Sequence, residues 1–280
     1  GHLVVTTCNG FEMENIPSLI PGESQVKLSG KPYKPVSYPG RMRWGEIHIW
    51  AKYRKVIMED AVPGIGHLNG IGIDQEDNIY MLSSARRIID GKQTDPAMGY
   101  DASGTILKVK AGKNKTYSSD NNITIPLPSA QFPKRSIDMQ GATAGWVEGA
   151  EWLYGGVGFC TPHECICWNA RFSKDYFNRS FAPEPQNYSV AVIDSSGNLI
   201  LRVGKYGNVD DGKPLIPEGG PKETRSIGGD EVGLFYACYV ASHTDKRLFI
   251  ADAGNTRILS VKLGYNTEEK IFLKNVIDKK

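Results

Sequence analysis

The chain lacks the features that mark several large classes of protein. No stretch approaches the roughly 18 to 20 consecutive apolar residues that span a bilayer, so the sequence predicts no transmembrane segment. Lys and Arg total 33 against 31 Asp and Glu, which leaves a formal net charge of +2. Proteins that bind nucleic acid usually carry a stronger basic excess, so we expect no nucleic-acid partner.

Sequence fingerprints of common cofactors and catalytic sites are missing as well. The sequence contains no P-loop, dinucleotide fingerprint, Gly-x-Ser-x-Gly elbow or His-Glu-x-x-His. It also contains no Cys-x-x-Cys-His, so it has no haem motif. We therefore expect no nucleotide cofactor.

The composition favours many short strands. The 280 residues include 31 Gly, 16 Pro and 13 Tyr. Gly and Pro interrupt helices, and Tyr is enriched in strands. The chain begins Gly1-His2-Leu3, without Met or the zones of a signal peptide. We expect an extracytoplasmic protein, periplasmic or secreted, whose leader is not present in this chain.

A strand-turn-strand pattern recurs along the sequence. Residues 70–82 combine alternating apolar residues with an Asp-rich turn, and residues 189–204 repeat the pattern around Gly197-Asn198. Residues 239–261 supply three successive strands. Such internal repeats are typical of solenoids and propellers.

The segment Leu248-Phe249-Ile250-Ala251-Asp252-Ala253-Gly254-Asn255-Thr256-Arg257-Ile258 resembles the hallmark of NHL repeats. Residues 189–204 resemble the outer hairpin of that repeat. Residues 70–88 resemble the inner hairpin, although Ser83 replaces its Asp and Ala85-Arg86 replaces its Gly-Asn. These matches cover roughly a third of the chain, and residues 90–180 match loosely. The resemblance implies a β-propeller and leaves the activity open, because the family includes scaffolds, receptors and enzymes.

Length suggests how many blades the ring contains. A four-stranded blade needs about 40 to 50 residues, so the chain holds about six. We predict an all-β, single-domain (1–280), six-bladed NHL-like propeller. Its blades are expected at 40–62, 63–112, 115–158, 168–208 and 228–264, and the sixth pairs 270–273 with 3–7 to close the ring. Irregular excursions are expected near 9–39, 117–145 and 206–229.

One short loop gathers soft metal ligands. Thiolate and imidazole suit zinc, which makes the loop a candidate metal site. Its residues are Cys160, His163, Cys165 and Cys167. A disulfide-bonded loop explains the same residues equally well.

A second candidate site lies on the expected propeller axis. The resemblance places His67, Asn69 and Cys238 at entries to inner strands. In the related amidating lyases such histidines bind zinc, and in gluconolactonases Glu, Asn and Asp bind calcium. Cys238 stands where an amidating lyase carries a ligand, which argues against that activity.

Aromatic residues beside arginines suggest a third site, a groove for a small polar or carbohydrate ligand. Alternating aromatic and charged residues also fit a plain two-sided blade surface. The groove candidates are Arg43, Trp44, His48, Arg171 and Arg179.

Two functional hypotheses follow. The first is an extracytoplasmic module that binds a ligand or another protein and forms part of a larger polypeptide. The second is a metal-dependent lyase or lactone hydrolase, with the ion on the axis or in the Cys/His loop.

Overall fold

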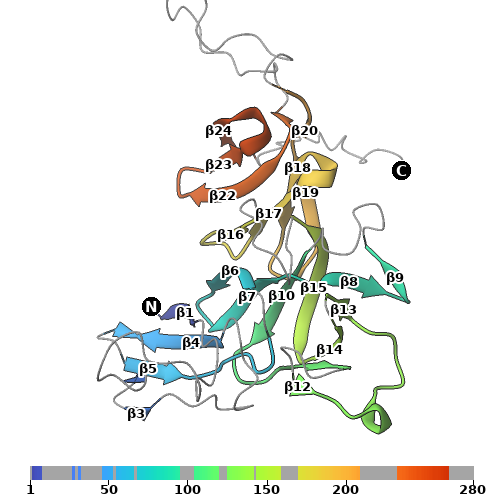
Figure 1. The fold of residues 1–280 in the computed structure, drawn as a ribbon. Helices are drawn as coiled ribbons and strands as arrows, with labels where there is room; N and C mark the ends of the chain where they lie inside the picture. Colours follow the sequence, from blue (N-terminus) through green and yellow to red (C-terminus); the bar gives the residue numbers. More distant parts are fainter. Residues whose placement is uncertain are drawn as a thin grey trace, which may run out of the picture.

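The computed structural model describes residues 2–7, 27–28, 31–32, 46–52, 55–65, 68–94, 104–119, 125–141, 143–158, 170–208 and 232–264. These residues form strands, turns and short 3-10 helices, which confirms the all-β prediction. The strands are arranged in several small, mainly antiparallel sheets (Figure 1). Within these ranges, no helix has the length and apolar character needed to cross a membrane.

Five of the sheets contain three or more strands. The first is β1 (Leu3–Thr7), β4 (Glu46–Ala51) and β5 (Lys55–Met58). The second is β6 (Leu68–Ile73), β7 (Asn78–Ser83), β10 (Gly104–Lys110) and β15 (Ala150–Val157). The third is β8 (Arg86–Ile89), β9 (Lys92–Gln93), β11 (Lys115–Ser118), β12 (Ile125–Pro126), β13 (Met139–Gln140) and β14 (Ala144–Glu148).

The remaining sheets belong mostly to the C-terminal half. One is β16 (Ser173–Lys174), β17 (Ser180–Glu184), β18 (Ser189–Ile193) and β19 (Leu199–Val203). Another is β22 (Ala237–His243), β23 (Arg247–Asp252) and β24 (Arg257–Lys262). Two-stranded pairs are β2 (Lys27–Leu28) with β3 (Lys31–Pro32) and β20 (Lys205–Tyr206) with β21 (Gly233–Leu234). The 3-10 helices are η3 (Ser129–Gln131), η4 (Pro185–Asn187) and η6 (Ala253–Asn255).

Three hairpin turns in this fold are held by an aspartate at their first position. The Oδ1 of Asp74 accepts the N–H groups of Glu76 and Asn78, both at 2.9 Å. Asp175 and Asp194 accept the corresponding pairs of N–H groups in their own turns. The carboxylate replaces backbone hydrogen bonds that the reversed chain cannot make, so short-range chemistry fixes these turns.

The fourth residue of each such turn has a left-handed backbone. In the turn between β22 and β23, His243 takes the first position and its Nδ1 accepts the N–H of Asp245 at 3.3 Å. The left-handed residues are Asp77, Asn178, Gly197 and Lys246, with φ between 61° and 86°. Four turns therefore share one backbone design while their sequences differ.

The second sheet differs from the predicted blade at 63–112. Its fourth strand is β15, which pairs with β10 after the chain has passed through the third sheet. Residues 86–93 leave the second sheet and join the third as β8 and β9. Gly149 separates β14 from β15 with φ +76°, and a Cβ there would lie 2.3 Å from the carbonyl oxygen of Lys113. Only glycine fits this bend.

The N-terminal strand pairs within the first sheet. β1 lies antiparallel to β4, with Leu3 opposite Trp50 and Thr7 opposite Glu46. The strand expected at 270–273, its predicted partner, lies outside the described residues. Closure of the ring and the number of blades therefore stay predictions.

Three apolar cores lie between neighbouring sheets. The first packs β4 against β7 and β10, and includes Ile47, Met81 and Leu107. The second joins the second sheet to β17 and β18, and the third joins those strands to β22 and β23. In Figure 1 the sheet of β22 to β24 lies at the top, followed below by the sheet of β16 to β19. The edge strand β16 lies beside both β6 and β22, which are edge strands of the neighbouring sheets.

Candidate functional site

Several residues predicted to form sites lie outside the described ranges. They are His67, Arg43, Trp44 and the loop residues Cys160, His163, Cys165 and Cys167. The metal hypotheses for His67 and the Cys/His loop, and the groove hypothesis for Arg43 and Trp44, stay predictions. Within the described ranges, no group of three or more His, Cys, Asp or Glu side chains could hold a metal ion.

Two of the groove candidates, His48 and Arg179, are buried or ion-paired in the structure. His48 lies on β4 with 0% of its surface exposed, and burial lowers its pKa although Glu59 and Asp60 oppose the shift. Arg179 pairs with Asp175 at 2.6 Å and covers the ring of Phe181. Neither side chain is presented on an open surface.

The other three predicted residues meet where three sheet edges converge. Asn69 lies on β6, Arg171 lies two residues before β16, and Cys238 lies on β22. Each of these strands is an edge of its sheet. The N–H of Arg171 donates to the carbonyl oxygen of Cys238 at 2.9 Å. Its terminal nitrogen Nη1 donates to Oδ1 of Asn69 at 2.9 Å. The structure therefore brings together residues that sequence analysis assigned to two different candidate sites.

A buried serine orients the asparagine. The amide nitrogen of Asn69 donates to Oγ of Ser84 at 2.6 Å. Asn69 is 7% exposed and Ser84 4% exposed, whereas Arg171 is partly exposed. We call Asn69, Ser84, Arg171 and the backbone of Cys238 the Arg171 cluster. It is a hydrogen-bonded chain that runs from a buried hydroxyl to a guanidinium at the surface.

Close packing fixes the strands around this cluster. A Cβ on Gly70 would lie 2.8 Å from the ring of Phe172, so β6 and the segment before β16 approach closely at that point. The hydroxyls of Ser173 and Ser242 lie 3.4 Å apart and join β16 to β22. Rigid strands on both sides hold the guanidinium in place.

Cys238 contributes its backbone to the cluster. Its thiol is buried and free, and Sγ donates to the carbonyl oxygen of Ala251 at 3.5 Å. Burial raises the pKa of this thiol. A protonated thiol is a poor metal ligand, because the thiolate is the form that binds metals.

A second cation lies further along the same edge. The Nζ of Lys174 donates to Oδ1 of Asn178 at 2.8 Å and lies 5.5 Å from the ring centre of Tyr80. Burial lowers the pKa of Lys174, whereas Asp74 and Asp175 raise it. The amine therefore has polar and aromatic neighbours but no direct ion pair among the described residues.

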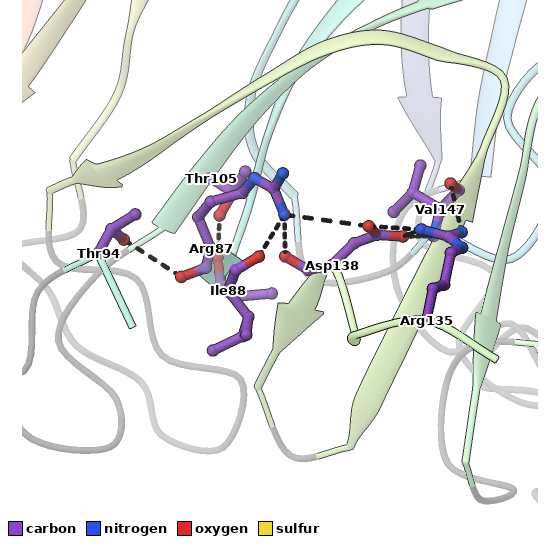
Figure 2. Close-up of polar contacts among 8 residues, drawn as sticks. Arg87, Ile88, Thr94, Thr105, Arg135, Asp138 and Val147 are labelled. Atoms are coloured by element: carbon purple, nitrogen blue, oxygen red, sulfur yellow. Dashed lines mark hydrogen bonds and ion pairs between the residues drawn. The ribbon is translucent and has the colours of Figure 1, made fainter. Parts of the chain in front are cut away.

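The third sheet contains a different arginine cluster, shown in Figure 2. Arg135 donates to both carboxylate oxygens of Asp138, at 2.7 and 2.8 Å, and the N–H of Val147 donates to one of them at 2.6 Å. Arg87 donates to the carbonyl oxygen of Asp138 at 2.7 Å. Asp138 forms an ion pair with Arg135, and its hydrogen bonds to Arg87 and Val147 connect β8, β13 and β14.

Ser84 was missed by sequence analysis. The available signal was the departure from the NHL pattern at Ser83, where the repeat carries an acid. The residue that follows, Ser84, is also buried and polar, so it needs a hydrogen-bond partner, and that partner is Asn69.

Comparisons with known proteins yield distant similarities. No protein family profile matches the chain, and no curated protein matches it. Among solved structures, a catalytically inactive virginiamycin B lyase from Staphylococcus aureus, with quinupristin, is 14% identical, with 71% of each chain covered and a TM-score of 0.21. A streptogramin B lyase is 12% identical over 79% of this chain and 76% of its own, with a TM-score of 0.23. A protein of unknown function from Bacteroides caccae is 14% identical over 80% and 88%, with a TM-score of 0.18.

Proposed function

We propose that the chain is a six-bladed, NHL-like propeller outside the cytoplasm that acts as a binding module for a small polar or carbohydrate ligand. The ligand site is the Arg171 cluster. The observation that carries the proposal is the meeting of three edge strands, from three sheets, at a buried hydrogen-bonded pair that positions a partly exposed guanidinium.

The cost of the cluster supports a role beyond folding. Replacing both partners of a buried hydrogen bond by apolar groups of the same shape can be nearly neutral or even stabilising, so folding alone does not require an amide and a hydroxyl at these positions. Ligand sites commonly consist of a few polar groups fixed on rigid elements. Asn69 and Ser84 have that arrangement with respect to Arg171.

The chemistry of the cluster favours binding over catalysis. An amide, hydroxyls and a guanidinium supply hydrogen-bond donors and acceptors. Nucleophilic catalysis would need a nucleophile within reach of a base, and the thiol of Cys238 bonds to the backbone of Ala251 instead.

A ligand screen tests the proposal. Neutral and acidic mono- and disaccharides and small polar metabolites are screened by thermal shift, and hits are measured by calorimetry. We expect a hit to lose at least about tenfold in affinity in Arg171→Met, since a hydrogen bond to a charged group contributes about 1.5 to 3 kcal/mol. Arg247→Met is the matched control, because Arg247 forms a surface pair with Asp245 away from the cluster. Hits that bind wild type and Arg171→Met equally would refute the site.

A further inference from the structure

We infer that Arg171 recognises an anionic group on the ligand: a carboxylate, phosphate or sulfate. This inference rests on the proposed binding site and adds the charge of what binds there.

Arg171 differs from most other arginines of the described residues. Six of them have a carboxylate oxygen within 4.0 Å of a guanidinium nitrogen: Arg87, Arg135, Arg179, Arg202, Arg247 and Arg257. Arg86 is buried and donates to the side chain of Gln93. For Arg171, no described carboxylate lies at ion-pair distance. Within the described part of the chain, its positive charge is therefore not neutralised by a direct ion pair.

The partner of Arg171 orients the charge without cancelling it. Nη1 donates to the amide oxygen of Asn69 and to the carbonyl oxygen of Ala170, at 2.9 and 3.2 Å. Both acceptors are neutral. An aspartate at position 69 would form an ion pair with the guanidinium, whereas asparagine has the same shape and carries no charge. The site therefore keeps its positive charge available for a ligand.

The free edge of the guanidinium matches an oxyanion. Nε and Nη2 of Arg171 donate no hydrogen bond to any of the described residues. A guanidinium binds carboxylate, phosphate or sulfate through two parallel N–H donors, and such charge-assisted pairs are among the strongest hydrogen bonds.

Arginine side-chain NMR tests this inference directly. The Nε–Hε resonance of Arg171, assigned by its loss in Arg171→Lys, is followed while sodium sulfate, sodium phosphate or sodium glucuronate is added at constant ionic strength against sodium chloride. We expect a saturable shift at Arg171. The resonance of Arg247, already paired with Asp245, is the internal control and should move little. A shift at Arg171 that is linear, or no larger than that of Arg247, would overturn the inference.

The variant Asn69→Asp tests the same point by charge. It is nearly isosteric and should form an ion pair with Arg171, so we expect at least a tenfold loss of affinity for sulfate and glucuronate. A melting curve recorded by circular dichroism checks that the variant is folded. Undiminished affinity in the folded variant would contradict the inference.

A neutral counterpart separates this inference from the proposed function. Methyl glucoside, which lacks the carboxylate, should bind more weakly than glucuronate. If methyl glucoside binds equally well and depends on Arg171, the binding site stands and the anion preference is wrong. If no ligand from the screen depends on Arg171, the proposed function itself fails.

Discussion

Replacing Asp252 with Ala should destabilise the C-terminal sheet strongly. The carboxylate is 0% exposed and its Oδ1 accepts the N–H groups of Tyr236 and Phe235 at 2.8 and 3.1 Å. Its Oδ2 accepts from Asn255 at 2.6 Å and lies 3.4 Å from Nε of Arg257. One side chain thus ties the segment before β22 to the end of β23 and the start of β24.

The size of the effect follows from this environment. Removing one partner of a buried, hydrogen-bonded ion pair costs about 3 to 5 kcal/mol, because the other groups remain buried without a partner. Asp252→Ala removes the carboxylate acceptor of two backbone N–H groups and the counter-charge of Arg257, whose guanidinium also donates to the carbonyl oxygen of Gly233. Since a typical domain is stable by about 5 to 15 kcal/mol, we expect a large shift of the unfolding midpoint.

Urea unfolding followed by tryptophan fluorescence gives the free energy, and hydrogen exchange locates the loss. Exchange should accelerate most in peptides covering 233–262. The control is Asp245→Ala, which removes an exposed carboxylate from the same sheet and should leave the unfolding curve close to that of wild type. A loss for Asp252→Ala of less than about 1 kcal/mol, the range of ordinary substitutions, would refute the reasoning.

Three further predictions concern backbone, pH and metal. Gly149→Ala should destabilise the protein more than Gly91→Ala in urea unfolding. Both glycines have positive φ, but only a Cβ at position 149 would meet a backbone oxygen, that of Lys113 at 2.3 Å. Equal losses of unfolding free energy would contradict the claim that only glycine fits the bend at 149. Burial lowers the pKa of His48 below 6.5, so its stabilising contribution is complete above pH 6.5 and is lost as the pH falls through the pKa of the folded state. His48→Leu should therefore reduce the decline of unfolding free energy between about pH 7.5 and 5. An unchanged pH dependence would contradict this. If residues 160–167 form a zinc loop, as the metal-dependent lyase or lactone hydrolase hypothesis allows, elemental analysis of reduced protein should give about one zinc per chain, whereas a stoichiometric disulfide without metal would exclude it.

Hairpins were predictable because their information is local. The Gly197-Asn198 turn lies between β18 and β19 as expected, and the NHL-like segment forms β23, η6 and β24 in order. In both cases the turn chemistry and the alternation of flanking residues are sufficient. An aspartate at the first position of a turn is present at Asp175 as well, although residues 90–180 match the NHL repeat only loosely.

Long-range pairing could not be predicted in the same way. The strands β10 and β15 are separated in sequence by the whole central part of the third sheet, and their pairing depends on packing between sheets rather than on a turn. A local sign was present in Gly149, which interrupts an otherwise continuous strand pattern. The prediction of one blade over 115–158 did not take Gly149 into account, and β15 belongs to the second sheet instead.

The candidate site was predicted only in pieces for the same reason. Asn69 and Cys238 were proposed from the alignment of repeats, and Arg171 from its aromatic neighbours. Their contact depends on how three sheet edges meet, which no segment specifies alone. The role of Cys238 changed most, because its carbonyl oxygen and not its sulfur takes part.

The repeat itself explains where the cluster could arise. β17, β23 and β7 end in corresponding residues: Glu184, Asp252 and Ser83. Glu184 accepts from Arg202 at 2.6 Å and Asp252 approaches Arg257, so both acids are used within or beside their own sheet. In the second sheet no acid is present at this position, and the adjacent Ser84 turns to Asn69 instead. In place of the ion pairs that Glu184 and Asp252 form, the second sheet thus has a neutral hydrogen-bonded pair, Ser84 and Asn69, and the amide oxygen of Asn69 accepts from Arg171.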